Sequence, residues 1–199
     1  MPSPPKKPPA IGHHKLRIIG GRWRSRMLSF PAVDGLRPTG DRIRETLFNW
    51  LAPILPGSRC LDLFAGSGIL AFEALSRGAA HCSLVELNPA ATRQLRVNAD
   101  QLQADGAAIH PISALEFLAK PAAPFDVVFI DPPFAADLWQ PVMASLERGW
   151  LADGALIYVE CPSDLALNPP TTWHAHREKR AGQVCYRLYR YETNSEGRV

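Results

Sequence analysis

The feature that most constrains the fold is a regular alternation of apolar runs and helix-like segments between residues 59 and 160. The apolar runs are short and rich in branched or aromatic residues, as β-strands are, and the segments between them repeat apolar residues at helical spacing. Repeated strand–helix units predict a parallel sheet with helices on both faces. We expect strands near 59–63, 82–86, 108–112, 126–130 and 154–160, separated by helices near 68–77, 89–102, 114–119 and 137–148.

The pattern changes at both ends of this alternation. Residues 171–177 and 184–191 are typical of two strands joined by the turn 179–182, and this hairpin would close the sheet with one antiparallel strand at its edge. Before the alternation, a helix is predicted over about 40–52, with Thr39 as its N-cap. The predicted fold is an α/β, doubly wound, mostly parallel sheet of seven strands.

Composition indicates the class of protein and its compartment. Hydrophobic residues make up 46% of the chain and charged residues 21%, as in an ordinary globular domain. No run approaches the roughly 18 apolar residues of a membrane span, and the start lacks the apolar core of a secretory signal. The four cysteines form no Cys-x-x-Cys pair, which indicates buried thiols in a reducing compartment. We therefore expect a cytoplasmic protein without a zinc or redox centre.

Positive charge is concentrated at the front of the chain. Residues 1–44 carry a net charge of +8, whereas residues 45–199 carry −5. Two alternating runs flank Gly20-Gly21, a hairpin signal, and their period of two would place three arginines on one strand face. Such a face suits the phosphates of a nucleic acid, and the alternative is a solvated basic strand. The predicted nucleic-acid contacts are Lys15, Arg17, Arg22, Arg24, Arg26 and Arg37.

A glycine-rich turn follows the first predicted strand of the sheet. Gly66 and Gly68 would allow a tight turn and close approach of a ligand, and the helix after them offers free N–H groups. Asp62, just before the turn, would repel a pyrophosphate but suits a cationic group such as an ammonium. The second strand ends at Glu86, where nucleotide-binding sheets place an acid against ribose hydroxyls. A surface glutamate is the alternative for Glu86.

The buried run 127–130 ends in the tetrapeptide Asp131-Pro132-Pro133-Phe134. In open α/β sheets the carboxyl ends of the strands are where ligands bind. A carboxylate, a backbone carbonyl and a phenyl ring at that point suit a planar base with an exocyclic amine, because the two oxygens accept the amine protons while the rings stack. Asp-Pro-Pro is also ordinary turn chemistry, so the tetrapeptide alone leaves both interpretations open.

Three motifs carry a resemblance to a known class of enzymes. DLFAGSG (62–68), VELN (85–88) and DPPF (131–134) resemble the class I S-adenosylmethionine-dependent methyltransferases that modify exocyclic amines. The segments RIIGGRWRSRML, RPTGDRIRETLFNWL and RCLDLFAGSGILAFEALSRGA closely resemble the bacterial 16S ribosomal RNA guanine-N2 methyltransferase family of the RsmD type. The resemblance covers about residues 15–191. It implies a Rossmann-like methyltransferase domain over 36–192 behind a basic β-hairpin extension (15–35). The composition of the start predicts a disordered proline-rich leader over 1–14, and residues 193–199 are expected to be a flexible tail.

The resemblance also implies the site residues, the cofactor and the partner. The cofactor is S-adenosylmethionine, and its implied contacts are Asp62, Phe64, Gly66, Gly68, Glu86, Leu87, Asn88, Ser113 and Ala114. Many enzymes of this class carry an acid where this chain has Ser113. The implied catalytic residues are Asp131, Pro132, Pro133 and Phe134. The basic front segment is implied to dock 16S ribosomal RNA in an assembled small subunit or a late precursor, and the protein to act as a monomer away from any membrane.

Several alternatives remain open from the residues alone. An adenine-N6 methyltransferase acting on DNA or RNA shares the tetrapeptide, which does not specify the nucleobase. A nicotinamide oxidoreductase accounts for the glycines and Glu86 but not for Asp62. A non-catalytic RNA-binding assembly factor could retain the same fold. His13-His14, His174 and His176 are predicted to be surface histidines, because no third metal ligand is evident.

Overall fold

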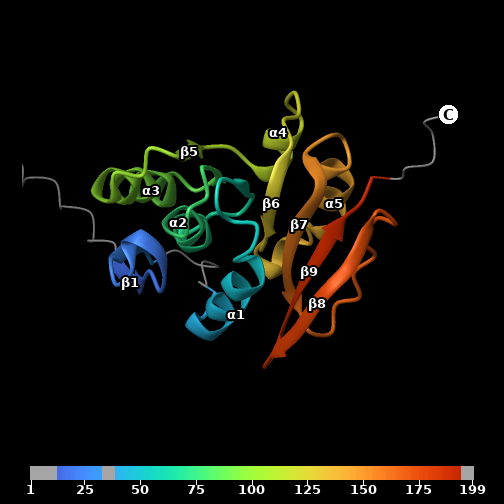
Figure 1. Ribbon diagram of the computed structural model, residues 1–199. Helices are drawn as coiled ribbons and strands as arrows, with labels where there is room; N and C mark the ends of the chain where they lie inside the picture. The colour runs from blue at the N-terminus through green and yellow to red at the C-terminus, as the bar shows by residue number, and fades with distance from the viewer. Residues whose placement is uncertain (1–12, 33–38, 194–199) are drawn as a thin grey trace, which may run out of the picture.

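The computed structural model describes residues 13–32 and 39–193 (Figure 1). Its strands are β1 (His13–Arg17), β2 (Met27–Pro31), β3 (Arg59–Asp62), β4 (His81–Val85), β5 (Ala107–His110), β6 (Phe125–Ile130), β7 (Leu151–Pro162), β8 (Trp173–Ala181) and β9 (Val184–Tyr191). Its α-helices are α1 (Asp41–Leu51), α2 (Ile69–Ser76), α3 (Pro89–Leu102), α4 (Ala114–Leu118) and α5 (Trp139–Leu146), and two 3-10 turns are η1 (Gly21–Trp23) and η2 (Phe134–Ala136).

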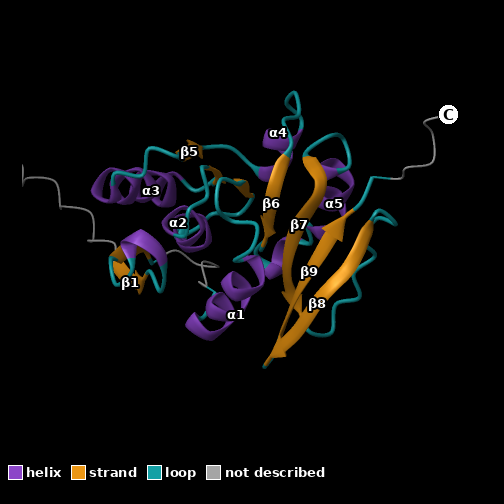
Figure 2. Cartoon of the chain, in the orientation of Figure 1, coloured by secondary structure: helices purple, strands orange, loops and turns teal. Residues whose placement is uncertain are grey.

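Seven strands form the main sheet, in the order β5-β4-β3-β6-β7-β9-β8 (Figure 2). The first five of these run parallel to one another, and β9 runs antiparallel to both of its neighbours. The predicted α/β, doubly wound, mostly parallel seven-stranded sheet is therefore confirmed. The antiparallel strand lies one place in from the edge, and β8 forms the edge itself.

The central strand β6 shows why the sheet is covered on both faces. Val127 and Phe129 pack into a core that joins the N-terminal hairpin, α1, α2 and α3. Val128 and Ile130 pack into a second core with α4 and α5. All four side chains are fully buried, because alternate residues of a strand point to opposite faces and a helical layer covers each. Within the described residues, no helix is both long and apolar enough to cross a membrane.

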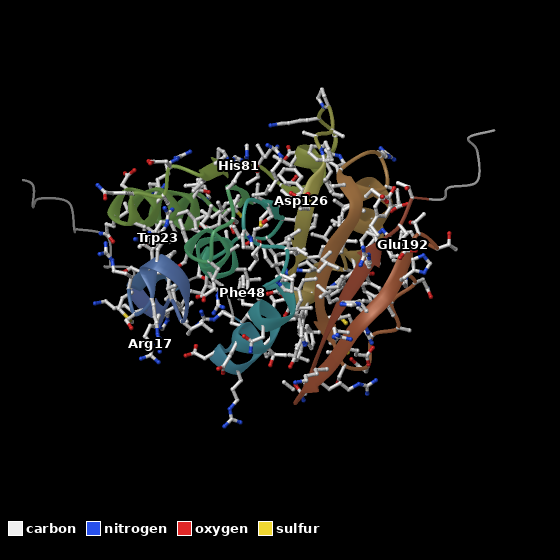
Figure 3. The ribbon with its side chains drawn as sticks, viewed as in Figure 1. Arg17, Trp23, Phe48, His81, Asp126 and Glu192 are labelled. Atoms are coloured by element: carbon white, nitrogen blue, oxygen red, sulfur yellow. The ribbon has the colours of Figure 1, made fainter. Side chains whose placement is uncertain are left out.

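An N-terminal hairpin forms, but its turn is not the predicted one, and β1 begins at His13, two residues inside the segment predicted as a disordered leader. β1 and β2 pair antiparallel, with Arg17 opposite Met27, and the chain between them folds into η1 instead of turning at two glycines. The prediction that three arginines share a strand face is wrong, because Arg22, Arg24 and Arg26 lie in this connection. Trp23, labelled in Figure 3, accounts for the difference. Its side chain is buried, and its backbone N–H donates to the Ser76 hydroxyl of α2 at 2.9 Å.

Element boundaries elsewhere agree to within three residues, with two informative exceptions. The helix predicted over 40–52 is α1, but its N-cap is Gly40, which has no side chain to cap with, and not Thr39. The Thr39 side chain instead turns into the sheet edge described below. Strand β8 continues to Ala181, so the turn of the last hairpin is Gly182-Gln183 and not 179–182. In that turn Gly182 adopts a φ of +60°, a conformation that favours glycine.

Candidate active site

The glycine turn after β3 requires both of its glycines. Gly66 and Gly68 have φ values of +49° and +77°, in the left-handed region that other residues rarely adopt. A Cβ on Gly68 would also lie 2.5 Å from Leu95 Cδ2 and 2.6 Å from Phe72 Cε2. The chain thus passes closely over α2 and α3, and Gly68 is the N-cap of α2. The turn leaves the first N–H groups of that helix at the carboxyl edge of the sheet.

Glu86 fixes the loop after β4 to the glycine turn. One carboxylate oxygen accepts a hydrogen bond from the Gly66 N–H at 2.8 Å, and the other accepts from the Asn88 N–H at 2.7 Å. Asn88 in turn caps α3, its side-chain oxygen accepting from the N–H groups of Ala90 and Ala91. Each Glu86 oxygen keeps a second lone pair for a ligand hydroxyl. Glu86 therefore links the glycine turn of the DLFAGSG motif to the VELN motif at one edge of the sheet.

Asp62 is a buried acid at the end of β3, with only 2% of its surface exposed. Burial raises its pKa from 3.8 to about 7, the N–H of Phe64 opposes the rise, and the charge of Glu86 adds to it. The Phe64 N–H lies 3.4 Å from Asp62 Oδ1. A nearby cation strongly stabilises the ionised form of a carboxyl group that is buried away from water and close to another acid. Its environment thus suits the ammonium group that the sequence suggested.

The adenine-side residues predicted from the sequence show two kinds of environment. Leu87 is 65% exposed at the sheet edge, an apolar surface open to a ligand, whereas Ala114 is buried. Ser113 is the N-cap of α4 in a capping box: its hydroxyl donates to Glu116 Oε2 at 2.6 Å and accepts from the Glu116 N–H. Leu115, the next residue of this helix, is also partly exposed.

Asp131 lies at the carboxyl end of β6, half-buried and close to other acids. Burial raises the pKa of Asp131 well above its usual value, and the negative charges of Glu160 and Asp62 raise it further. The Thr39 hydroxyl opposes these effects, since it lies 3.5 Å from Asp131 Oδ2 and 3.4 Å from Glu160 Oε2. Glu160 also accepts a hydrogen bond from the Tyr158 hydroxyl at 2.8 Å.

Three of these neighbours were missed by sequence reasoning. Thr39 was assigned to a helix cap, and Tyr158 and Glu160 were left within a predicted strand. Glu160 carried a usable signal, because it is an acid that ends the predicted strand 154–160, as Glu86 ends the predicted strand 82–86. Thr39 carried none, since it is 92 residues from Asp131 in sequence.

The rest of the tetrapeptide forms one wall of the site. Pro132 is buried and Pro133 is exposed, and the Pro133 carbonyl accepts from the Ala136 N–H at 2.8 Å to close η2. Phe134 is 43% exposed, unusual for a large apolar side chain, and its ring centroid lies 6.0 Å from that of Trp139. Trp139 is itself fixed, because its indole N–H donates to the Glu160 carbonyl at 2.8 Å. An exposed phenyl ring on a rigid support is available for stacking.

A buried arginine connects this site to the N-terminal hairpin. Arg44 of α1 has no exposed surface, and its guanidinium donates to the carbonyl of Arg17 at 3.1 Å and to the carbonyl of Thr39 at 3.2 Å. Its charge is balanced by Asp41 at 2.7 Å and by the buried Glu73 at 3.5 Å. Glu73 also accepts from the Ile19 N–H at 2.9 Å. The hairpin, α1, α2 and the Thr39 backbone therefore share one polar cluster.

Five of the six predicted nucleic-acid contacts are described, and all five are exposed on the hairpin. Arg22 stacks over the Trp23 ring at 4.1 Å, and Arg26 donates to the Gln101 carbonyl at 2.9 Å. Lys15 and Arg24 are exposed, as is Arg17, which borders a cavity of about 430 Å³ between the hairpin and α1. Arg37 lies outside the described residues. Residues 13–32 and 39–193 contain no cluster of three or more His, Cys, Asp or Glu side chains that could hold a metal ion.

Fold and site together define a class of protein. A sheet in this strand order, with a glycine turn after β3 and acids at the ends of β3, β4 and β6, is that of a class I S-adenosylmethionine-dependent methyltransferase. Over residues 16–190 the chain matches the family described as Conserved hypothetical protein 95. It is 51% identical over 193 residues to ribosomal RNA small subunit methyltransferase D of Escherichia coli (strain K12), covering 96% of this chain and 98% of that protein.

Further comparisons agree with this match. The methyltransferase D of Haemophilus influenzae is 47% identical over 180 residues, covering 88% of this chain and 93% of the relative. Among solved structures, yhhF from Escherichia coli superposes with a TM-score of 0.84 at 48% identity, covering 91% of this chain and 100% of its own. Protein HI0767 from Haemophilus influenzae gives 0.79 at 44% identity, covering 90% and 99%. The chain belongs to the ribosomal RNA small subunit methyltransferase D family.

Proposed function

We propose that this enzyme methylates the exocyclic N2 amine of one guanine in 16S ribosomal RNA, within the small subunit or a late precursor of it. The observation that carries the proposal is Asp131 at the carboxyl end of β6, followed directly by the Pro132 carbonyl and the exposed Phe134 ring. The names of its relatives supply the class of RNA. We further propose that it acts as a monomer in the cytoplasm, where small subunits are assembled.

The residues at the ends of β3 and β4 fit the proposed cofactor. S-adenosylmethionine supplies an electrophilic methyl group carried on a sulfonium. Asp62 would hold the ammonium of its methionine part, because that carboxyl is buried and only backbone N–H groups oppose the rise in its pKa. Glu86 would accept ribose hydroxyls with its remaining lone pairs, and the backbone of the Phe64–Gly68 turn would approach closely. The proposed adenine-side contacts are Leu87, Asn88, Ser113 and Ala114.

Asp131 and the Pro132 carbonyl would orient the guanine amine. The N2 lone pair is delocalised into the purine ring, so the nitrogen is a weak nucleophile until it becomes pyramidal. Two oxygen acceptors on its two protons favour that geometry and stabilise the positive charge that develops on nitrogen. Phe134 would hold the base by stacking, worth roughly 1–3 kcal/mol. Because the base must leave its stack to reach this edge, a loop or a partly assembled particle is a better substrate than a regular duplex.

The hairpin would dock the RNA. Lys15, Arg17, Arg22, Arg24 and Arg26 are exposed on this element, and we propose the same role for Arg37. Loop-borne arginines reach phosphates in more directions than a single strand face does, and a stacked guanidinium such as that of Arg22 can also meet a base. We accordingly propose residues 15–35 as the RNA-docking extension and residues 36–192 as the methyltransferase domain.

The test is methyl transfer from labelled S-adenosylmethionine to small subunits that lack the modification, followed by nucleoside analysis. N2-methylguanosine is the expected product. Asp131→Ala should lower the transfer rate by about 10²–10³-fold or more while leaving cofactor binding largely intact, because it removes one preorganised acceptor at the reacting amine. Asp105→Ala, which removes an exposed acid far from this edge, is the matched control.

Each other outcome has a distinct meaning. N6-methyladenosine as the product would keep the chemistry of the site and replace the nucleobase. Cofactor binding without transfer to a demonstrably unmodified subunit would favour a non-catalytic assembly role. Equal loss of cofactor binding and transfer in Asp131→Ala would mean that Asp131 supports the structure and does not orient the amine.

A further inference from the structure

A second basic element lies at the other end of the chain. Residues 45–172 carry six Lys or Arg and fourteen Asp or Glu, a net charge of −8, whereas residues 173–191 carry five Lys or Arg and one Glu, a net +4. The latter are β8, β9 and their turn. The body of the enzyme is thus strongly acidic, and positive charge is found in two hairpins that are remote in sequence. An acidic body repels RNA, so contact with a polyanion must be made through these basic elements.

The basic side chains of β8 face solvent. Of its nine residues only Trp173 is buried, because β8 is the edge strand of the sheet. Glu178, the acid of this hairpin, accepts from Arg187 at 2.8 Å and lies 3.9 Å from Arg180. Arg177 and Lys179 make no ion pair with any described residue, and Lys179 lies 6.0 Å from the ring centroid of Trp50 on α1. Two cations of β8 therefore have no ion-pair partner among the described residues.

The register of the sheet places these cations beside the active site. Lys179 is opposite Tyr186 of β9, which is opposite Glu160 of β7. The residue before Glu160, Val159, is opposite Ile130, the last residue of β6 before Asp131. Lys179 and Asp131 thus lie at the same carboxyl edge, three strand spacings or roughly 14 Å apart along the sheet. RNA that flanks a base held at Asp131 would pass within reach of β8.

The two basic hairpins lie on opposite sides of α1 (Figure 1). The N-terminal hairpin is joined to α1 through the Arg17 carbonyl and Arg44, and β8 meets the far end of the same helix at Trp50. Thr39, just before α1, contacts Asp131. The acidic active site therefore lies between two basic elements.

We propose that the β8–β9 hairpin is a second RNA-contact surface, which binds the backbone beside the target base through Arg177 and Lys179 while the N-terminal hairpin binds on the other side. This inference rests on the proposed ribosomal RNA substrate. Charged side chains on an edge strand also deter pairing with other sheets. That role alone would not require the positive sign or the position beside Asp131.

The test is RNA binding by the full chain, measured over a range of salt concentrations with protein-free small-subunit RNA and with unmodified small subunits. Arg177→Glu with Lys179→Glu should weaken binding to both, on the order of tenfold at moderate salt, and should reduce the slope of log affinity against log salt by about 1.4–1.8. Arg177→Gln with Lys179→Gln should have a smaller effect of the same sign. The matched control is Lys120→Glu with Arg148→Glu, the same change in charge at exposed positions beyond the opposite edge of the sheet.

Each result either supports or contradicts the proposal that the β8–β9 hairpin binds RNA. Equal affinity and slope in the charge-reversed pair and the control would overturn it. Weaker binding to assembled subunits alone, with unchanged binding to protein-free RNA, would mean that β8 meets a ribosomal protein and would overturn the RNA assignment. Since binding is measured apart from transfer, wild-type enzyme that binds RNA through β8 but forms no N2-methylguanosine would contradict the proposed reaction and leave the surface standing.

Discussion

The cofactor half and the target half of the active-site edge differ in how far apart their contacting residues lie in the sequence. The cofactor half, Asp62–Gly68 with Glu86–Asn88, is held by hydrogen bonds between residues two to twenty positions apart. The target half, Asp131–Phe134 with Thr39 and Glu160, depends on contacts 92 and 121 positions apart. The first half is a local motif that a sequence can show, and the second exists only once α1 has docked on the sheet.

The largest expected effect comes from Arg44, which holds α1 in the position on which the target half depends. In Arg44→Met the carbonyls of Arg17 and Thr39 lose their donor, and the buried Glu73 loses one of its cations. We expect the free energy of unfolding to fall by about 3–5 kcal/mol, as when one partner of a buried ion pair is removed. Urea unfolding measures this, and Arg42→Met, an exposed position on the same helix, is the control. A loss below about 1 kcal/mol would show that α1 docks without this cluster.

Gly68 tests the cofactor half in the same way. In Gly68→Ala the new Cβ would meet Leu95 and Phe72 in a backbone conformation that disfavours alanine, so we expect a loss of roughly 1–3 kcal/mol in stability together with weaker cofactor binding. Gly57 provides a matched control, because its φ is +78° and a Cβ there would have no atom within 4 Å. Similar losses in both variants would assign the whole effect to the backbone angle and none to the close approach.

These two halves explain how much the sequence could predict. The sheet, the glycine turn and the acids Asp62, Glu86 and Asp131 can be predicted from local sequence patterns at the ends of strands. The strand order then only determines that these three acids lie near one another. The turn at Trp23 and the position of Thr39 could not be predicted. Each is decided by a partner on another element, Ser76 for the Trp23 N–H and Asp131 for the Thr39 hydroxyl. Local propensity is a weak guide where tertiary contacts decide.

Asp62 allows the cofactor half to be examined by pH. Its pKa of about 7 means that the free enzyme holds a proton there below neutrality, and an ammonium ligand must displace it. Cofactor affinity should therefore rise with pH, by up to tenfold per unit between about pH 5 and pH 7, and level off above. The stability of the free enzyme should change in the opposite sense. A raised acid pKa stabilises the folded state at low pH, and that contribution is lost as the pH rises from 3.8 to about 7.

Calorimetric titration over this pH range checks the affinity, and Asp62→Asn is the control that removes the titrating group while keeping its shape. Its affinity for the cofactor should be low and nearly independent of pH. An affinity of the wild type that falls as the pH rises would contradict the proposed contact with an ammonium.

Thr39 gives the smallest expected effect and the sharpest test of the target half. Its hydroxyl is the group that opposes the rise in the pKa of Asp131, which Glu160 and Asp62 face from the neighbouring strands. In Thr39→Val that opposition is removed, so the pKa of Asp131 should rise further. If the reaction uses the ionised carboxylate, the acidic limb of the pH–rate profile should move to higher pH, and the rate at neutral pH should fall about fivefold, as for one lost hydrogen bond.

A merely structural role for Thr39 would lower stability without moving the pH profile. Thr39→Ser keeps the hydroxyl and should restore the wild-type profile. Thr172→Val, which removes a threonine–carboxylate hydrogen bond of 2.8 Å to Glu147 on another part of the molecule, should leave the profile in place. Cofactor affinity should be unchanged in all three variants, because Thr39 belongs to the target half. A loss of cofactor affinity in Thr39→Val would instead mean that the two halves share this residue. The cofactor site would then also depend on contacts between residues distant in sequence, and the contrast between the two halves would fail.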